Sequence, residues 1–523
     1  MLSIGVLREP ATVEGFTGQG GVRGGASEEA DLIHNHLTVL DPQETARPQL
    51  ATELPSVENG TWKINQDGTM DMTWKLHPGV KWQDGTPFTS DDLLFSLMLH
   101  KDPDLAHSYR AQTNAMESAT APDPLTLIVH WSRVDIRALE GLGLTPMPRH
   151  LMEELYRTDK NSFIQSTRFT SDWVGLGPYR LTNWVPGSQM EMVRNEDYFL
   201  GRPLLDRVIV RFIGDPNAMV ANLLAGSIEL VIPPSIEIET ALNLKQQWEG
   251  TGNVVRLDPL PRIDYMELQF RPEAAKPVNG LPVLAVRQAL YQAIDRQVLS
   301  QAMTGGLAPP ADSWFSPLDP ARKDVESAIP QFPYDPARAR QLLAQAGWQP
   351  GADGVLVHSP SGERFSMEMW TNPQTSDKIT AIVADAWKAI GVNGQITAIP
   401  PARAEDREFQ SQHPGPLITG VNIPDLLDRY DSRQVASPAN RWSGRNRAGY
   451  ANQRADQLLD QLATTIDLKA RVPLQREQVQ IVMGEVGMMP LFWEPRPLVA
   501  LKSVKGDISA EHTGWNAFTW DKQ

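Results

Sequence analysis

The sequence predicts an α/β protein with more than one domain, and three observations support this class. Residues 70–76 alternate apolar and polar side chains, and residues 208–213 are almost continuously apolar, so both read as β-strands. Apolar residues recur at three- and four-residue spacing over 379–390, which predicts a helix that Gly391 ends, and an apolar strand pattern at 395–399 follows directly. The length of 523 residues is enough for about three or four domains.

The balance of elements changes along the chain. The amino-terminal part reads mainly as strands and turns, whereas helical spacing becomes frequent after about residue 280. A single helix with one buried stripe is predicted over 286–298, and residues 342–346 repeat the pattern of a helix ended by a glycine, here Gly347. We therefore expect an early strand-rich part followed by a second α/β domain.

The composition is that of a folded protein without affinity for polyanions. Hydrophobic residues make up 41% of the chain and charged residues 21%. The formal net charge of −15 argues against nucleic acid as a partner. The absence of cysteine excludes disulfides, thiolate metal sites and a cysteine nucleophile. No stretch approaches about 18 consecutive apolar residues, and residues 1–5 lack the features of a secretory signal, so we expect neither a membrane span nor a leader here.

Common catalytic signatures are missing from the sequence. It contains no G-x-S-x-G elbow, no phosphate-binding loop and no H-E-x-x-H pair. His34 and His36 could place two imidazoles on one face of a strand, but no completing ligands are evident nearby, and a polar turn or helix start is the simpler interpretation. We therefore expect neither a metal nor a cofactor.

Tryptophan is unusually frequent, with fifteen residues against nine tyrosines. Indole rings supply contact area at low entropic cost, so such a protein often lines a ligand site with some of them. Four tryptophans lie in strand or helix patterns and are interpreted as packing residues: Trp74, Trp82, Trp184 and Trp387. Five lie beside loop-forming residues, and we expect some of these to contact a ligand: Trp173, Trp370, Trp442, Trp493 and Trp515.

Several segments, taken in order, resemble the family 5 extracellular solute-binding proteins, which are the dipeptide- and oligopeptide-binding components of ABC importers. The most specific segment is WKLHPGVKWQDGTPFTSDD at 74–92, and GLGPYRL at 175–181 is similar to a second family motif. The remaining matching segments are 48–52, 193–198, 286–296, 334–347 and 490–493. The resemblance spans nearly the whole chain.

The resemblance implies a two-lobed periplasmic-binding-protein fold of class II and the large peptide-binding type, with a hinge. Lobe one would comprise residues 1–260, including an extra subdomain at about 42–170, and lobe two residues 261–485. Residues 486–523 would return to lobe one. It further implies an exported, periplasmic or extracellular receptor without enzymatic activity. Such a receptor, which we expect to be a monomer, would deliver a peptide or similar organic solute to an ABC permease. Lipid anchoring of the precursor is left open.

The resemblance also implies candidate ligand contacts. Peptide receptors of the family hold the peptide ammonium with an aspartate ahead of a proline, but here Val421 stands at that place, and Asp425 either substitutes for it or caps a helix. Aromatic planes with polar partners would also suit an oligosaccharide, which is one alternative; a hydrolase working in the same cleft is another. The full set of predicted ligand contacts is Glu9, Tyr109, Trp173, Trp370, Arg403, Asn422, Asp425, Trp442 and Trp493.

Overall fold

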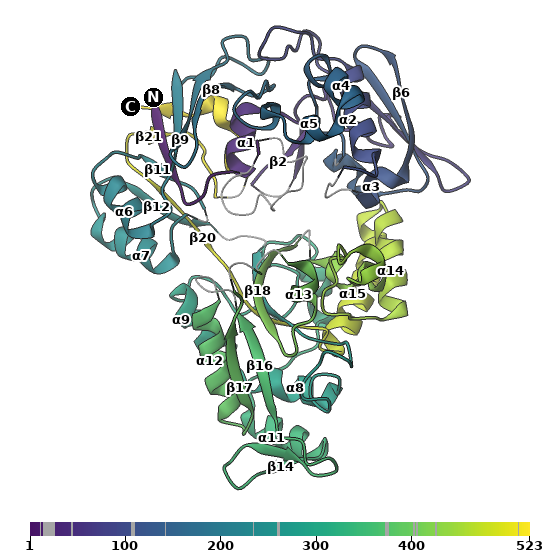
Figure 1. Cartoon of the computed structure of the whole chain (residues 1–523), viewed down its shortest axis with the longest axis vertical. Helices are drawn as coiled ribbons and strands as arrows, with labels where there is room; N and C mark the ends of the chain where they lie inside the picture. Colours follow the sequence, from purple (N-terminus) through teal and green to yellow (C-terminus); the bar gives the residue numbers. More distant parts are fainter. Residues whose placement is uncertain are drawn as a thin grey trace. The chain divides into compact units, whose positions relative to one another are not determined.

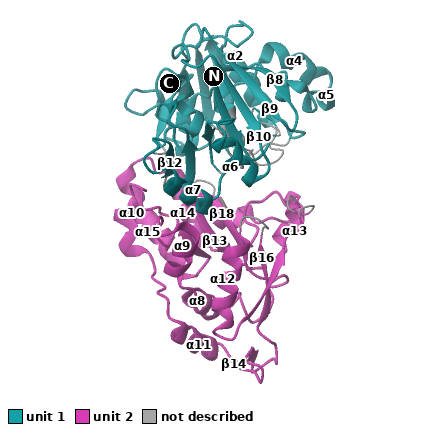
Figure 2. Ribbon diagram, turned by 90° about the vertical axis from the view of Figure 1, so that its left-hand side faces the viewer, with its two compact units in different colours: residues 1–258, 496–523 teal, residues 259–495 magenta. Residues whose placement is uncertain are grey.

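The chain folds into two compact units. The computed structural model describes residues 1–10, 12–13, 27–42, 45–105, 110–141, 143–233, 235–258, 262–371, 376–400, 403, 406–423, 426–510 and 512–523. Unit 1 comprises Met1–Asp258 and Arg496–Gln523, and unit 2 comprises Pro259–Pro495 (Figure 2). The chain therefore passes from unit 1 to unit 2 after Asp258 and returns at Arg496. None of the helices in the described part of the chain is long and apolar enough to cross a bilayer.

Unit 1 is built on a seven-stranded sheet with the order β12-β20-β11-β1-β10-β9-β8. Its strands are β1 (Leu2–Val6), β8 (Tyr179–Val185), β9 (Gln189–Arg194), β10 (Arg207–Phe212), β11 (Leu230–Val231), β12 (Val254–Asp258) and β20 (Arg496–Ala500). β1 is parallel to β10 and β11, while β20 is antiparallel to β11 and β12. The yellow carboxyl-terminal chain thus returns into this sheet through β20 (Figure 1). The carboxyl ends of β1, β10, β11 and β12 lie at one end of the sheet, where β20 begins.

Helices cover both faces of this sheet. Helices α6 (Pro216–Leu224) and α7 (Ile238–Gln247) pack on one face through Met219, Leu223 and Leu244. A larger apolar cluster, with Leu32 of α1 (Ser27–Ile33) and Phe163 of α5 (Lys160–Ile164), covers the other face. The helices of unit 1 are α1 (Ser27–Ile33), α2 (Ser90–Lys101), α3 (Arg110–Ala115), η1 (Ile136–Glu140), α4 (Arg149–Thr158), α5 (Lys160–Ile164), η2 (Thr167–Phe169), α6 (Pro216–Leu224), α7 (Ile238–Gln247) and η9 (Thr513–Thr519).

A second sheet of unit 1 has four strands in the order β4-β5-β7-β6. Its strands are β4 (Trp62–Ile64), β5 (Met70–Lys75), β6 (Met116–Asp123) and β7 (Thr126–Trp131). In β5 the side chains of Met70, Met72 and Trp74 are buried while the alternate ones are not, which confirms the alternating strand predicted there. Two short pairs complete unit 1: β2 (Thr38–Leu40) with β3 (Ala46–Pro48), and β21 (Val504–Lys505) with β22 (Asp521–Lys522).

Unit 2 is built on a five-stranded sheet with the order β17-β16-β18-β13-β19. The strands are β13 (Arg262–Glu267), β16 (Ser366–Thr371), β17 (Asn393–Ala398), β18 (Leu417–Asn422) and β19 (Met488–Trp493). β16 is parallel to β17 and β18, and β13 is antiparallel to its neighbours β18 and β19. A separate hairpin pairs β14 (Trp348–Pro350) with β15 (Leu356–His358).

The helices of unit 2 confirm one prediction and correct another. Over α12, Val383 and Trp387 are buried, and Gly391 follows with a φ of +88° before β17 begins, as predicted. The single helix predicted over 286–298 is wrong, because Asp295 caps a new helix there and leaves Val298 59% exposed. The helices are α8 (Leu284–Gln292), α9 (Arg296–Thr304), α10 (Arg322–Val325), η3 (Glu326–Ala328), α11 (Pro336–Gln345), α12 (Asp377–Lys388), α13 (Arg407–Ser411), η6 (Leu427–Tyr430), η7 (Ser432–Gln434), η8 (Pro438–Asn440), α14 (Gln453–Thr464) and α15 (Leu468–Gly484).

Candidate ligand-binding site

One end of the unit 2 sheet gathers the ends of several strands. The parallel strands β16, β17 and β18 finish there at Thr371, Ala398 and Asn422, and β19 finishes beside them at Trp493. β13 runs the other way and begins there at Arg262. In open α/β sheets, ligands bind outside the carboxyl ends of the strands. This end of the sheet is therefore the candidate site in unit 2.

One face of the sheet end is apolar core. Residues directly opposite one another in neighbouring strands point to the same side, and Ile263 is paired with both Val421 and Trp493. All three are buried and belong to one hydrophobic cluster. The Val421 side chain therefore packs inside unit 2, and an acidic residue at this position would be buried in the same apolar cluster.

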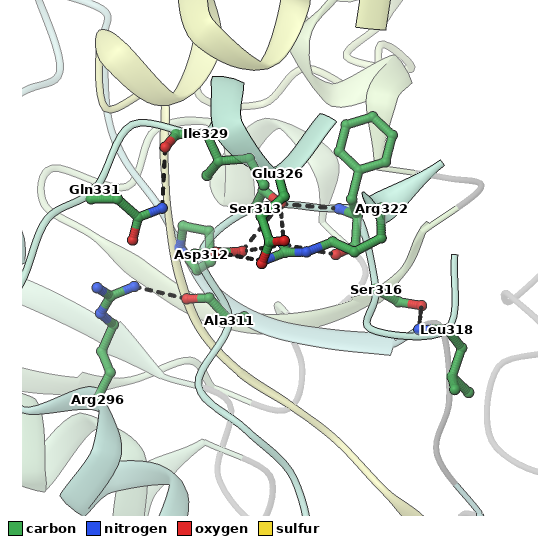
Figure 3. A network of polar contacts seen from close by, with 12 residues as sticks. Arg296, Ala311, Asp312, Ser313, Ser316, Leu318, Arg322, Glu326, Ile329 and Gln331 are labelled. Atoms are coloured by element: carbon green, nitrogen blue, oxygen red, sulfur yellow. Dashed lines mark hydrogen bonds and ion pairs between the residues drawn. The ribbon is translucent and has the colours of Figure 1, made fainter. Parts of the chain in front are cut away.

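The segment after α9 closes this apolar face. Pro310 forms a bridge with Phe492, and the backbone N–H of Ala311 donates to the carbonyl of Leu491 at 3.1 Å, so the segment extends the edge of β19. The guanidinium of Arg322 then holds the Asp312 carboxylate through two contacts of 2.6 and 2.8 Å (Figure 3). Two aromatic residues of the same segment, Trp314 and Phe315, join the cluster that contains Trp493.

The opposite face of the sheet end carries polar side chains beside the buried Phe492, which is paired with Asp264. Asp264 is paired with Gly420, and Arg262 is paired with Asn422, so these four residues point to the same side. Glu494 follows β19 and joins them, because its carboxylate forms an ion pair with the Arg262 guanidinium and its N–H donates to the Arg262 carbonyl at 3.1 Å. We call the side chains of Arg262, Asp264, Asn422 and Glu494 the polar face.

Asp264 is the most buried member of the polar face. Its residue is only 7% exposed, yet no described residue donates a hydrogen bond to its carboxylate or forms an ion pair with it. Burial, and then the charge of Glu494, raise the pKa of Asp264 from 3.8 to about 7, and Arg262 only partly opposes this rise. The Oδ1 atom of Asn422 is also buried without a partner among the described residues. One buried acceptor, Asn422 Oδ1, therefore lies on the same face of the sheet end as the Asp264 carboxylate.

A second buried carboxylate on β13 is engaged through one oxygen, Oε2, while its Oε1 is buried without a hydrogen-bond partner among the described residues. Glu267 accepts hydrogen bonds from Arg429 Nη1 at 3.0 Å, from Arg447 Nη2 at 2.9 Å and from the Tyr265 hydroxyl at 3.2 Å. Burial alone raises the pKa of Glu267, but Arg447 and Arg429 outweigh this effect and lower the pKa to about 2. This network stabilises the interior of unit 2.

An aromatic stack lies beside the end of β16. The rings of Trp370 and Phe409 are 4.4 Å apart at 30°, and the Arg403 guanidinium lies 4.3 Å from the centre of the Phe409 ring. The Trp370 indole N–H donates to Glu368 at 2.9 Å, and Arg403 pairs with Asp406 at 2.9 Å. Two predicted contacts, Trp370 and Arg403, are thus joined through Phe409, a residue that no sequence motif singled out.

Two predicted tryptophans lie in strands rather than loops. We expected Trp370 and Trp493 in loops because they lie beside proline, glycine, asparagine or threonine. Instead, Trp370 is the next-to-last residue of β16 and Trp493 is the last residue of β19, and they are 6% and 4% exposed. The neighbouring turn residues follow the ends of the two strands, so local composition wrongly predicted loops at these tryptophans.

Trp442 lies in an unusual turn. Both Arg441 and Trp442 have positive φ values, 53° and 60°, a left-handed conformation that costs non-glycine residues about 1–3 kcal/mol. The Arg271 guanidinium lies 6.0 Å from the Trp442 ring and donates to the Ala436 carbonyl at 2.7 Å. Such strain often accompanies ligand contacts, and it keeps Trp442 a candidate.

The predicted contacts of unit 1 lie in separate places. Glu9 follows β1, and its carboxylate accepts from Trp184 Nε1 at 2.5 Å and from the Gly187 N–H at 2.8 Å, which ties it to the β8–β9 hairpin. Trp173 is 3% exposed with its ring 5.0 Å from His34, whose pKa is lowered well below 6.5 by burial and by His36. Two predicted contacts, Tyr109 and Asp425, lie outside the described residues.

Both units together have the fold of the two-lobed binding proteins. The structure is similar to the oligopeptide-binding protein from Thermus thermophilus complexed with a pentapeptide, with a TM-score of 0.82 and 22% identity over 100% of this chain and 96% of that chain. Residues 45–440 match the bacterial extracellular solute-binding proteins, family 5 Middle, and the chain belongs to this family. The family and the two-lobed α/β fold class predicted from the sequence are confirmed.

The relatives of this chain are named for binding different ligands. The chain is 25% identical to the oligopeptide-binding protein AppA of Bacillus subtilis over 84% of this chain and 76% of the relative. It is 24% identical to heme-binding protein A of Haemophilus influenzae over 90% of this chain and 84% of the relative. The comparisons therefore support a solute-binding receptor and leave its solute to be determined.

Proposed function

We propose that this protein is a receptor that captures a peptide and passes it to the permease of an ABC importer. The single observation that carries the proposal is the family match over 45–440. The similarity to AppA and to a pentapeptide complex favours peptide over other solutes. The acceptors of the polar face, Asp264 and Asn422, suit the N–H donors that a peptide presents.

The proposed action requires no chemistry on the ligand. A ligand that contacts both units stabilises the closed state by its difference in affinity for the two states, and the permease recognises that state. The ligand is released unchanged, so the protein is not an enzyme. In this proposal the mature protein works outside the cytoplasmic membrane, in the periplasm or at the cell surface, as a monomer.

The test is native mass spectrometry of the freshly purified protein, repeated after incubation with a mixture of short peptides. Bound masses that match intact peptides would support the proposal. Masses spaced by hexose units would replace it with an oligosaccharide receptor, the alternative that the aromatic side chains keep open. Shortened peptides would contradict a receptor and indicate a hydrolase, and a protein that binds none of the peptides would contradict the peptide assignment.

A further inference from the structure

We propose that the outer edge of β12 in unit 1 binds an extended, acidic segment of another polypeptide, which joins the seven-stranded sheet as an additional strand. β12 is the first strand in the order of this sheet, and α7 lies beside it (Figure 1). The surface belongs entirely to unit 1. The proposal therefore goes beyond the receptor function proposed above and does not depend on it.

The first argument is the direction of the backbone groups of β12. Leu501 lies one residue beyond β20 and donates its N–H to the carbonyl of Glu229, beside β11, at 2.8 Å. Backbone groups alternate between the two edges of an antiparallel strand, so those of the preceding residue, Ala500, face β12. They bond there to Val254, which is directly opposite Ala500. This fixes which residues of β12 use their backbone groups inside the sheet.

The same alternation leaves the outer edge of β12 open. It places the N–H and C=O groups of Val255 and Leu257 on that edge, and no described residue bonds to them. Edge strands are normally protected by bulges, proline, charged side chains or a covering segment. β12 keeps an unbroken register with β20 and contains no proline, and the Arg256 guanidinium bonds to the Ile508 carbonyl. An open edge of this kind is a template for one more strand.

The second argument is a groove beside this edge. A solvent-open groove of about 880 Å³ lies between α7 and the start of β12. Trp248 lines it, is 7% exposed, and joins the apolar cluster under α7 together with Val255. The helical side of the groove is formed by Leu242, Lys245, Gln246 and Glu249. Their three- and four-residue spacing places them on one side of α7 and of the turn that ends it. A strand paired with β12 would place every second side chain in this groove.

The third argument is the charge around the groove, which selects the occupant. Lys245 and Glu249 line the groove, and Lys502 lies beside it, because a Cβ atom at Gly252 would be 3.7 Å from Lys502 Cβ. Within the described residues, none of these three charged side chains forms an ion pair. Two lysines and one glutamate leave one positive charge, on a chain whose net charge is −15. An acidic segment complements this part of the surface.

The probe is a synthetic octapeptide that alternates valine and glutamate, is blocked at both ends and carries fluorescein. Its binding to the purified protein is measured by fluorescence anisotropy. Two modified forms carry N-methyl groups either on all valine amides or on all glutamate amides. In a paired strand, one of these sets faces β12 and the other faces solvent, so methylation separates strand pairing from other modes of binding.

Three variants test the protein side of the interaction. Val255→Pro removes an outward N–H and keeps the bonds that Val254 and Arg256 make to β20. Val255→Thr is the matched control, because it keeps the N–H and a branched side chain. Lys245→Glu reverses one charge of the groove. Circular dichroism establishes that each variant is folded.

One methylated peptide should bind the wild type about tenfold more weakly than the unmodified peptide, and the other should bind about as tightly, since strand pairing uses alternate amides. Val255→Pro should weaken binding of the unmodified peptide about tenfold, whereas Val255→Thr should keep the affinity within about twofold. Lys245→Glu should weaken binding about threefold at low salt and less at high salt.

Three results would overturn the proposal: an octapeptide that does not bind, two methylated forms that bind equally, or an affinity that survives Val255→Pro. A wild-type dimer in sedimentation that Val255→Pro converts to a monomer would also overturn it, because a second copy would then occupy the edge. The methylation comparison uses the wild type and decides the proposal even if Val255→Pro does not fold. The receptor function stands in each case, since these residues lie outside the polar face.

Discussion

Asp264 and Glu267 lie three positions apart on β13, both more than nine-tenths buried, yet their pKa values move in opposite directions. Glu267 has two guanidiniums and a hydroxyl around it, whereas Asp264 has no direct partner among the described residues and a second carboxylate nearby. Burial penalises both charges, so the partners decide whether the buried charge is tolerated. A stabilising interior group and a candidate binding group are thus distinguished by their contacts and not by their depth.

The two carboxylates also give opposite dependences of stability on pH. The folded-state pKa of Glu267 is lowered from 4.5 to about 2, so its contribution to stability is present above about pH 4.5 and is lost as pH falls through about 2. The folded-state pKa of Asp264 is raised from 3.8 to about 7, so stability is highest below about pH 3.8 for this group and is lost as pH rises through about 7.

The largest expected effect comes from Glu267→Gln. Loss of this charge leaves Arg429 and Arg447 buried without a counter-charge, which should lower the free energy of unfolding at pH 7 by about 3–5 kcal/mol. Urea denaturation followed by circular dichroism measures this. An unchanged midpoint and slope would mean that the two guanidiniums are satisfied by their other contacts.

Asp264→Asn should act in the opposite direction. Removing an unpaired buried charge should raise the free energy of unfolding at pH 8 by about 2 kcal/mol, with little change at pH 4 where the wild-type carboxyl is protonated. The same urea experiment at the two pH values tests it. Destabilisation at pH 8 would show that the carboxylate has a stabilising partner in the folded protein.

Gly420→Ala tests the crowding above β18. The added methyl group would come within 2.9 Å of Asp264 Oδ1 and overlap the Arg262 guanidinium, so both side chains must move. Overpacking of this kind should cost about 1–2 kcal/mol of stability and weaken binding of a peptide. Thermal unfolding and calorimetry measure the two effects, and Gly394→Ala, at another crowded glycine of the same sheet, shows what crowding away from the polar face does.

Glu494→Gln should have the smallest effect on stability. Glu494 is partly exposed, and its ion pair with Arg262 should contribute about 0.5 kcal/mol. Its removal takes away a charge that raises the pKa of Asp264 and leaves Arg262, which lowers that pKa. The loss of stability that accompanies Asp264 ionisation should therefore move to lower pH, which urea denaturation over a pH series measures. A transition that does not move would show that burial alone sets the Asp264 pKa.

Local elements were largely predictable from the sequence. Three features depend only on side chains two to four positions apart: the alternation over β5, the apolar stripe of α12 and the glycine that follows it. Such short-range patterns can be recognised in the sequence alone. The break between α8 and α9 escaped prediction although Asp295 was visible, because the apolar spacing continues across it. The family could be recognised for a related reason, since its segments occur in the same order along nearly the whole chain.

The candidate site was not predictable in the same way. Asn422 was selected from the sequence, but Asp264 and Glu494 were not, and Phe409 was found only through its contact with Trp370. Val421 was singled out because it stands where peptide receptors of the family have an aspartate. The strand register places its side chain in the core, and it places Gly420 and Asn422 on the side of the polar face. A shift of one residue reverses the side on which a strand presents its side chains, and the register depends on pairing between segments more than 150 positions apart. Order along the chain therefore determines the elements and the family, whereas the pairing of distant strands determines which charges meet.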